Sequence, residues 1–569
     1  MKTRIIEGAA RLKQKLTEGK GFVENLSIDE QVIISKLPTD TKYFHFINIE
    51  FRKGILFENI KDIKAGIYFI NCSGNTLAIT NCHISIPSDN TELPEGSGLI
   101  LDNCKFEDVN LFENINFSRG VTIKNESIID HLIVRDSKFK LDGIRIEKST
   151  INKNFDVISV DSEYGITCDD SFIKCKLRIN DLIGGSFATD NTKYEKDLHF
   201  DKNKIYVIFN NSIFEDDVYF RGNEIESFTS FNDDFYRSLD FQVINEFKGG
   251  FLNEVYIHNS KAGEGIEFSG FDTDLKKINI PITNLLNGTI KFSNFRVKET
   301  LISGLNSNAN LIFQGMSFKN LQIEDFHNKA GLTFANCKGS EDSKLTITDS
   351  HLGNSIFLSF DFESFQKIEI ESSVLHDIEL SNPILPNSAQ IISDEIDLKK
   401  LNSKKREVFR QLRHAVSKKG DSILTKELRA EELELFRKEK SNTSIFNRDR
   451  IILWLSSTND MGLNWSKPIF ILLGFTFIFH LFVVAAHSDT LTFVNPLCIS
   501  EVDWSKTFSV YLSYGAYFWS MFNPIRNLQS ILGESAGALN GWVYFWDGLH
   551  RIILAFFIFQ IVSAFRKYL

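Results

Sequence analysis

The chain has 569 residues, of which 43% are hydrophobic, and a formal net charge of −10. General nucleic-acid binding needs a basic face, so this charge argues against it. With 52 Phe but only four Met and nine Pro, the composition favours stacked strands joined by tight turns over helical bundles.

The N-terminal segment, residues 1–39, begins with a mixture of Arg, Lys and Glu and contains no long apolar run. A classical signal peptide requires such a run after its basic start. We therefore expect that the following segment is not exported through an N-terminal signal and stays in the cytoplasm.

Residues 40–390 carry a short repeat, in which a small residue is followed by alternating apolar residues and then by Asn, Asp or Ser. From Gly98 to Gly165 the glycines that open the repeat lie 22, 23 and 22 residues apart. A fixed period in this range indicates a solenoid or a propeller, but a propeller blade needs about 40 residues. Short strand runs without helical periodicity favour a three-sided β-helix coil, with about fourteen coils stacked roughly 4.8 Å apart.

The residue types at the repeat positions have a physical reason. Equivalent side chains lie above one another in stacked coils, so inward Phe, Ile, Val and Leu form apolar ladders. Asn at the corners tolerates left-handed backbone geometry and extends amide hydrogen bonds from coil to coil. Four of the seven cysteines follow an Asn, which predicts small buried fillers in a reducing compartment and no metal site.

Two segments carry a resemblance to a known group of proteins. Asn211-Ser-Ile-Phe-Glu-Asp-Asp-Val-Tyr-Phe220 and Asn103-Cys-Lys-Phe-Glu-Asp-Val-Asn-Leu-Phe112 resemble the degenerate repeats of bacterial pentapeptide-repeat-like membrane proteins. The strict five-residue period is absent, so the resemblance is to the wider right-handed β-helix group and covers residues 40–385. It implies a mostly β fold, a right-handed parallel β-helix solenoid followed by an α-helical hairpin and a C-terminal α-helical transmembrane domain.

Residues 391–450 form a basic connector. Residues 396–450 hold sixteen Lys or Arg against nine Asp or Glu, and their apolar residues fall at helical spacing on both sides of Gly420. This pattern predicts a hairpin of two amphipathic helices. Its cations are candidates for contact with anionic lipid headgroups or an acidic partner, although a solvated helix that enforces topology is the plainer interpretation. The candidate contact residues are Arg406, Arg410, Arg413, Lys418 and Lys419.

Residues 451–569 form the expected membrane domain. Apolar runs at 468–486 and 545–565 are long enough to span a bilayer, and the aromatic segment 508–522 between them is expected to be re-entrant or interfacial. Basic residues lie before the first span and after the second, and the loop between them is acidic. This charge bias predicts a multi-pass protein with both termini in the cytoplasm.

This arrangement resembles the two-helix, ion-channel-like membrane modules that follow such repeats. The resemblance implies a location in the bacterial inner membrane, a homo-oligomer and a role in stress or antiviral defence. The middle segment lacks a Thr-x-Gly-Tyr-Gly filter sequence, so potassium selectivity through a carbonyl filter is not expected.

Four ionisable residues of the membrane domain are candidates for a pore or gate: His480, Asp547, His550 and Arg551. Asp547 and Arg551 stand four apart, so they share one face of a helix and can pair. Ionisable groups at membrane depth are costly, which favours a functional role. The alternatives are an anchor at the headgroup level for the group near Asp547, and an interhelical hydrogen bond for His480.

We therefore expect a non-enzymatic, membrane-anchored sensor or scaffold, whose cytoplasmic β-helix responds to a protein or small ligand and is coupled to an oligomeric, pore-forming membrane domain. The alternative is a tethered carbohydrate-active enzyme, because some β-helix enzymes use clustered Asp. The adjacent pairs Asp169-Asp170, Asp216-Asp217 and Asp233-Asp234 suit turns better, since neighbouring strand residues point to opposite faces. We expect no catalytic residue, metal or cofactor.

Overall fold

The chain divides into two compact units, Met1–Ile391 and Ile392–Leu569. The computed structural model describes residues 5–6, 8–18, 21–85, 98–113, 115–242, 251–258, 260–282, 287–418, 420–441, 444, 447–488, 504–532, 539 and 541–565.

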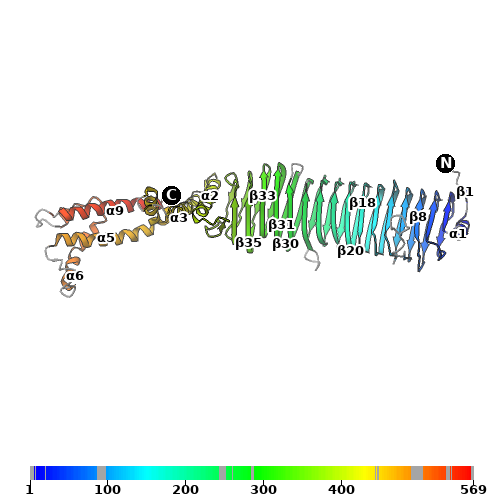
Figure 1. Cartoon of the computed structure of the whole chain (residues 1–569), viewed down its shortest axis with the longest axis horizontal. Coiled ribbons are helices and arrows are strands. Elements are labelled where there is room, and N and C mark those ends of the chain that lie inside the picture. Colours follow the sequence, from blue (N-terminus) through cyan, green and yellow to red (C-terminus); the bar gives the residue numbers. More distant parts are fainter. Residues whose placement is uncertain are drawn as a thin grey trace. The chain divides into compact units, whose positions relative to one another are not determined.

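The first unit is a parallel β-solenoid of about 16 turns that covers residues 22–392 (Figure 1). The predicted mostly β fold is therefore confirmed. The solenoid begins at β2 (Phe22–Glu24), earlier than the expected residue 40, and has more turns than the fourteen expected. At about 4.8 Å per turn, the stack is about 75 Å long.

One turn of the solenoid consists of β22 (Leu198–Asp201), β23 (Lys204–Asn210) and β24 (Ile213–Phe214). The next turn starts at β25 (Val218–Arg221), which pairs in parallel with β22. The pairing of β23 with β26 (Glu224–Phe231) shifts register between Ile205 and Val207, where β26 holds one more residue than β23. The turn therefore consists of three strands, in agreement with the predicted three-sided coil.

Stacked phenylalanines fill part of the solenoid interior. Eight of them follow one another through consecutive turns, with ring centroids 4.4 to 5.8 Å apart. Strand pairing places each ring directly over the equivalent ring of the next turn. Such contacts add to the burial of the rings. The ladder consists of Phe200, Phe220, Phe241, Phe268, Phe292, Phe313, Phe334 and Phe357.

Asparagines occupy the left-handed corner positions, as expected. Asn71 and Asn103 have φ values of 54° and 50°, and the Asn103 side chain donates a 2.7 Å hydrogen bond to Oδ1 of Asn71. The cysteines that follow these corners point inward, and all six described cysteines are buried and free. Burial raises the pKa of Cys168 and of Cys337 to about 12, so these thiols are protonated fillers. Cys498 lies outside the described residues.

In other turns, Ser or Thr occupies the inward position after the corner. The backbone N–H of Ser149 donates to Oγ of Ser171, and the N–H of Ser171 donates to Oγ1 of Thr192, both over 3.3 Å. The same bond joins Thr192 to Ser212. One turn later the position is taken by Asp233, whose Oδ1 accepts from the N–H of Ser212 over 2.8 Å. An ionisable carboxyl thus replaces a hydroxyl inside the ladder.

Helix α1 (Ala9–Glu18) lies at the first turn of the solenoid. It packs against β2 and against β4 (Val32–Ile34), with Leu12 and Leu16 buried between them. The backbone N–H of Ala9 donates to a carboxylate oxygen of Glu30 over 3.3 Å. The helix therefore covers strands of the first turn.

The second unit begins with the predicted helical hairpin, α2 (Leu398–Ser417) and α3 (Ser422–Glu439). Asp397 caps α2 by accepting from the N–H of Lys399, and Asp421 caps α3. The remaining elements are α4 (Arg448–Ser456), the 3₁₀ helix η1 (Ser457–Gly462), α5 (Ser466–His487), α6 (Trp504–Ser513), α7 (Gly515–Ser520), α8 (Leu528–Leu532) and α9 (Gly541–Phe565).

Helices α5 and α9 are long and apolar enough to cross a membrane, with mean hydropathy of 2.6 and 1.8 over their most apolar windows. They cover the predicted spans, and α9 begins one turn earlier than expected. The aromatic segment 508–522 breaks into α6 and α7, of 10 and 6 residues, which are both too short to span a bilayer. Tyr517 and Met521 are buried against α5 and α9.

Candidate functional site

The predicted group on α9 lies in the interior of the second unit. Asp547 is 2% exposed and His550 is fully buried. Nε of Arg551 donates to Oδ2 of Asp547 over 2.7 Å, which confirms the expected pairing four residues apart. The unit therefore buries a carboxylate one to two turns into an apolar helix.

A second guanidinium, that of Arg526, also binds Asp547. Its side chain is fully buried, Nε donates to Oδ1 of Asp547 over 2.7 Å, and Nη2 contacts the same oxygen. Nη1 donates to the carbonyl oxygen of Met521 over 2.7 Å. Removing Asp547 would leave the buried Arg526 guanidinium without a counter-ion, so the pair fixes the Arg526 segment against α9.

Sequence reasoning missed Arg526, although one signal was present. It is the one charged residue between Lys506 and Glu534, in a segment that separates two apolar helices. A lone cation in such a segment needs a counter-ion, and Asp547 is the available carboxylate in the next helix.

Two neutral side chains extend the network to α5 and α7. The hydroxyl of Tyr517 donates to Oδ1 of Asp547 over 3.1 Å. Nη2 of Arg526 lies 3.3 Å from Nδ1 of His550, and Nε2 of His550 lies 3.1 Å from Oγ1 of Thr476. Because a guanidinium can only donate, Nδ1 accepts, and a neutral imidazole then donates from Nε2 to Thr476. The network thus joins α5, α7 and α9.

The position of Thr476 gives the depth of this network. Thr476 lies near the middle of α5, about 15 Å along the helix axis from either end. The segment between the two long helices therefore runs back alongside α5 as far as the middle of that helix before α9 begins.

The turn after α7 directs its carbonyl groups toward arginines. The carbonyl oxygen of Met521 accepts from Nη1 of Arg526, while the carbonyls of Pro524 and Arg526 accept from Arg551 over 3.3 and 2.7 Å. Carbonyl oxygens used in this way are not free to replace the hydration shell of a cation. The turn differs in this respect from a carbonyl filter.

His480 lies beside the network but outside its hydrogen bonds. The ring is buried, packs against Tyr517 and Phe518 at centroid distances of 6.0 and 5.5 Å, and its Nδ1 has no hydrogen-bond partner among the described residues. Its role in a pore or an interhelical bond stays a prediction.

The connector arginines mostly satisfy their charges within the hairpin. Arg406 pairs with Glu439 over 3.2 Å and Arg413 pairs with Glu432 over 3.1 Å, so both join α2 to α3. Arg410 pairs with Glu407 on its own helix. Lys418 is the C-terminal cap of α2, and Lys419 lies outside the described residues. Their predicted contact with lipid or a partner stays a prediction.

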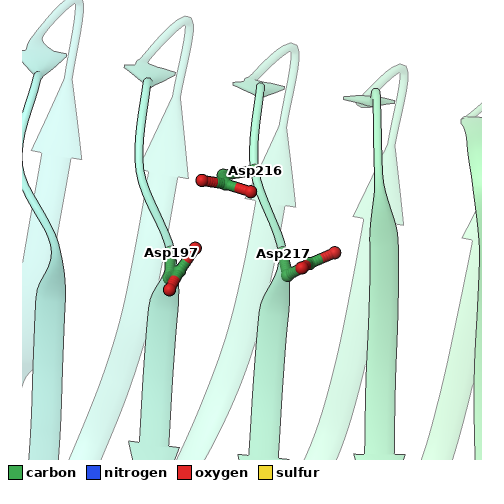
Figure 2. A group of neighbouring side chains, drawn as sticks. All are labelled: Asp197, Asp216 and Asp217. Carbon is green, nitrogen blue, oxygen red and sulfur yellow. The ribbon is translucent and has the colours of Figure 1, made fainter.

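The solenoid carboxylates are engaged in local contacts. Oxygens of Asp197, Asp216 and Asp217 come within 4.8 Å of one another (Figure 2). Arg237 pairs with Asp216 over 3.3 Å, and Asp217 accepts from Ser238. Burial, and then the neighbouring Asp197, raise the pKa of Asp216.

The other two adjacent pairs differ from each other. Asp233 points inward, whereas Asp234 is outward and pairs with Lys261 over 3.0 Å. Asp170 occupies a left-handed corner with a φ of 48°. These positions agree with the interpretation of the pairs as turn residues.

No protein-family model matches this chain, and comparisons with curated proteins and with solved structures return no match. The resemblance to pentapeptide-repeat-like proteins therefore has no support from a relative.

Proposed function

We propose that this chain is a membrane protein whose cytoplasmic β-solenoid receives a protein or small ligand and whose C-terminal unit assembles with further copies into a gated pore. The observation that carries the proposal is the position of the segment between α5 and α9. This segment runs back to the middle of α5, and the contact of Arg526 with Asp547 holds it there.

Exposed polar side chains on this segment support a water-facing side. Asn523 and Asn527 flank the buried Arg526 and are exposed on the surface of the unit. Polar side chains at this depth are costly against lipid but not against water. A second copy of the chain would be needed to enclose that water, because two helices and one short segment cannot surround a channel.

The basic connector supports a cytoplasmic solenoid. The repeat offers a long surface of stacked turns, a form that repeat proteins use for binding. Both long helices then return the chain to the cytoplasmic side. On this plan, binding at the solenoid changes the pore through the hairpin α2–α3.

Accessibility of the segment tests the pore directly. Purified full-length protein in liposomes is expected to pass ions, and an Asn523→Cys substitution in a Cys498→Ser background should allow a cationic, water-soluble thiol reagent to block them. The matched control is Phe470→Cys, on the exposed apolar surface of α5, which should not react. The six described native cysteines are buried and leave the background silent.

Two results would contradict this function. One is a protein that stays monomeric in lipid nanodiscs and carries no ions. The other is a reporter at the N-terminus that is found outside the cell, which would reverse the solenoid's location.

A further inference from the structure

A polar cavity lies where α3, η1 and the last turns of α9 meet. Its volume is about 260 Å³, below the roughly 300–1,000 Å³ of pockets that enclose drug-sized ligands. Lys426 and Arg429 of α3 line one side, and Gln560 and Ser563 of α9 line another. The size and lining suit a small polar group.

The cavity carries positive charge. Lys426 and Arg429 are the charged residues among those that line it, and the described lining includes no carboxylate. The Arg429 side chain is exposed at this surface. Ser456 and Ser563 also line the cavity, and their hydroxyl groups can donate hydrogen bonds. Two cations with adjacent hydroxyl donors form a recognition site for phosphate oxygens.

The wall of the cavity is held in place by the η1 turn. The Asn459 side chain donates to the carbonyl of Gln560 over 3.2 Å and accepts from the N–H of Gly462 over 2.9 Å. The intervening Asp460 and Met461 have φ values of 50° and 58°, an uncommon conformation for such residues. The turn is therefore fixed to α9 at the cavity, so little rearrangement is needed for binding.

The cavity lies at the level where the two apolar helices end. Trp465 precedes α5 and stacks on Phe565, the last residue of α9, at a centroid distance of 5.2 Å. Trp454 is 61% exposed, and Phe559, which lines the cavity, is 67% exposed. Tryptophan and cations gather at the headgroup level of membrane proteins, whereas an exposed Phe on the same rim suits acyl chains.

We propose that this cavity binds the phosphate headgroup of an anionic phospholipid from the leaflet on the connector side, with Lys426 and Arg429 as its cationic ligands. The site couples lipid composition to the joint between the hairpin and α9. The inference rests on the part of the proposed function that places α5 and α9 in the bilayer, but it does not require a pore.

Native mass spectrometry of the full chain in detergent tests the site with dioleoyl-phosphatidylglycerol as the probe. Wild-type protein should retain one tightly bound lipid per chain. Lys426→Ala/Arg429→Ala should weaken this binding about tenfold or more. Lys399→Ala/Lys400→Ala removes the same charge from exposed positions at the start of α2 and should leave it unchanged. Lys426→Arg/Arg429→Lys keeps the charge and should retain binding, which separates lost recognition from misfolding.

Other outcomes overturn the proposal. Equal retention of phosphatidylcholine would remove the role of the headgroup charge, and equal weakening by the control pair would remove the role of the cavity. Displacement of the lipid by inorganic phosphate, with no preference for the lipid, would identify a free-phosphate site instead. Resistance of the protein to alkaline extraction from membranes reports membrane insertion separately. A failure of membrane insertion can therefore be distinguished from a failure of lipid recognition.

Discussion

The guanidinium of Arg526 donates from Nε to Oδ1 of Asp547 over 2.7 Å, and both side chains are shielded inside the second unit. The two residues are 21 positions apart and lie in different elements. Arg551 binds the other carboxylate oxygen and also a backbone carbonyl, so two cations share one buried anion. This arrangement sets the position of the whole segment between α5 and α9.

Loss of either partner should destabilise the second unit. Asp547→Asn leaves the buried Arg526 guanidinium without a counter-ion, and a cost of about 3–5 kcal/mol is expected. Arg526→Gln leaves Asp547 paired with Arg551 and should cost less. The double variant should recover part of that loss. All six Trp lie beyond residue 391, so thermal unfolding followed by tryptophan fluorescence reports this unit. If the destabilisation of the double variant equals the sum of the destabilisations of the two single variants, the two residues do not interact.

Asp233 should make the stability of the solenoid depend on pH. Burial raises its pKa from 3.8 to about 7, although hydrogen bonds from Ser212, Ser230 and Phe231 oppose the rise. The folded chain therefore holds a proton that the unfolded chain has released between about pH 4 and pH 7. The stabilisation of the folded chain by this proton amounts to about 4 kcal/mol at most. It is fully present below pH 4 and is lost as the pH rises through 7.

Urea unfolding followed by far-UV circular dichroism measures this slope. Asp233→Ser replaces the carboxyl with the hydroxyl found at the equivalent Ser212 and should flatten it. Asp234→Asn changes the outward neighbour and should retain it. A slope that persists in Asp233→Ser would assign the pH dependence to other groups.

The phenylalanine ladder should be a main source of solenoid stability. Phe313 is fully buried and stacks between Phe292 and Phe334 at 5.5 and 5.0 Å. Phe313→Ala should cost about 3–5 kcal/mol, since it creates a cavity in a close-packed interior. Phe271→Ala, at a ring that is 60% exposed, is the matched control and should change the unfolding midpoint little. Similar midpoints for the two variants would contradict the role of the ladder.

The solenoid thiols should resist alkylation in the folded chain. Burial raises the pKa of Cys168 and Cys337 to about 12, and the thiolate is the reactive form. In a Cys498→Ser background, iodoacetamide at neutral pH should label the native chain negligibly and the urea-unfolded chain at all six remaining cysteines. Rapid labelling of any of the six in the native chain would show that its turn opens.

The solenoid could be predicted because each turn repeats the same local chemistry. Glycine-led strands and Asn corners recur at short intervals, so a one-dimensional pattern is enough to detect the stack. The first turn was missed although Gly21-Phe-Val-Glu-Asn25 carries the glycine-led pattern and its Asn corner. The extra residue of β26 between Ile225 and Phe228 could not be predicted, since it is defined by the pairing with β23.

The candidate site could be predicted only in part. Asp547 and Arg551 were found because their spacing places them on one helix face. Arg526, Tyr517 and Thr476 come from three other segments, and their meeting depends on the way the middle segment folds back between α5 and α9. Helical spacing carries no information about such contacts.

Helix α1 has a consequence for self-association. The first turn of a parallel stack leaves backbone donors and acceptors that can pair with the strands of another chain. Helix α1 buries Leu12 and Leu16 against β2 and β4, so it fills space beside the first turn that an incoming strand would need. We therefore expect α1 to hinder end-to-end association of solenoids, and its removal to favour the growth of fibres.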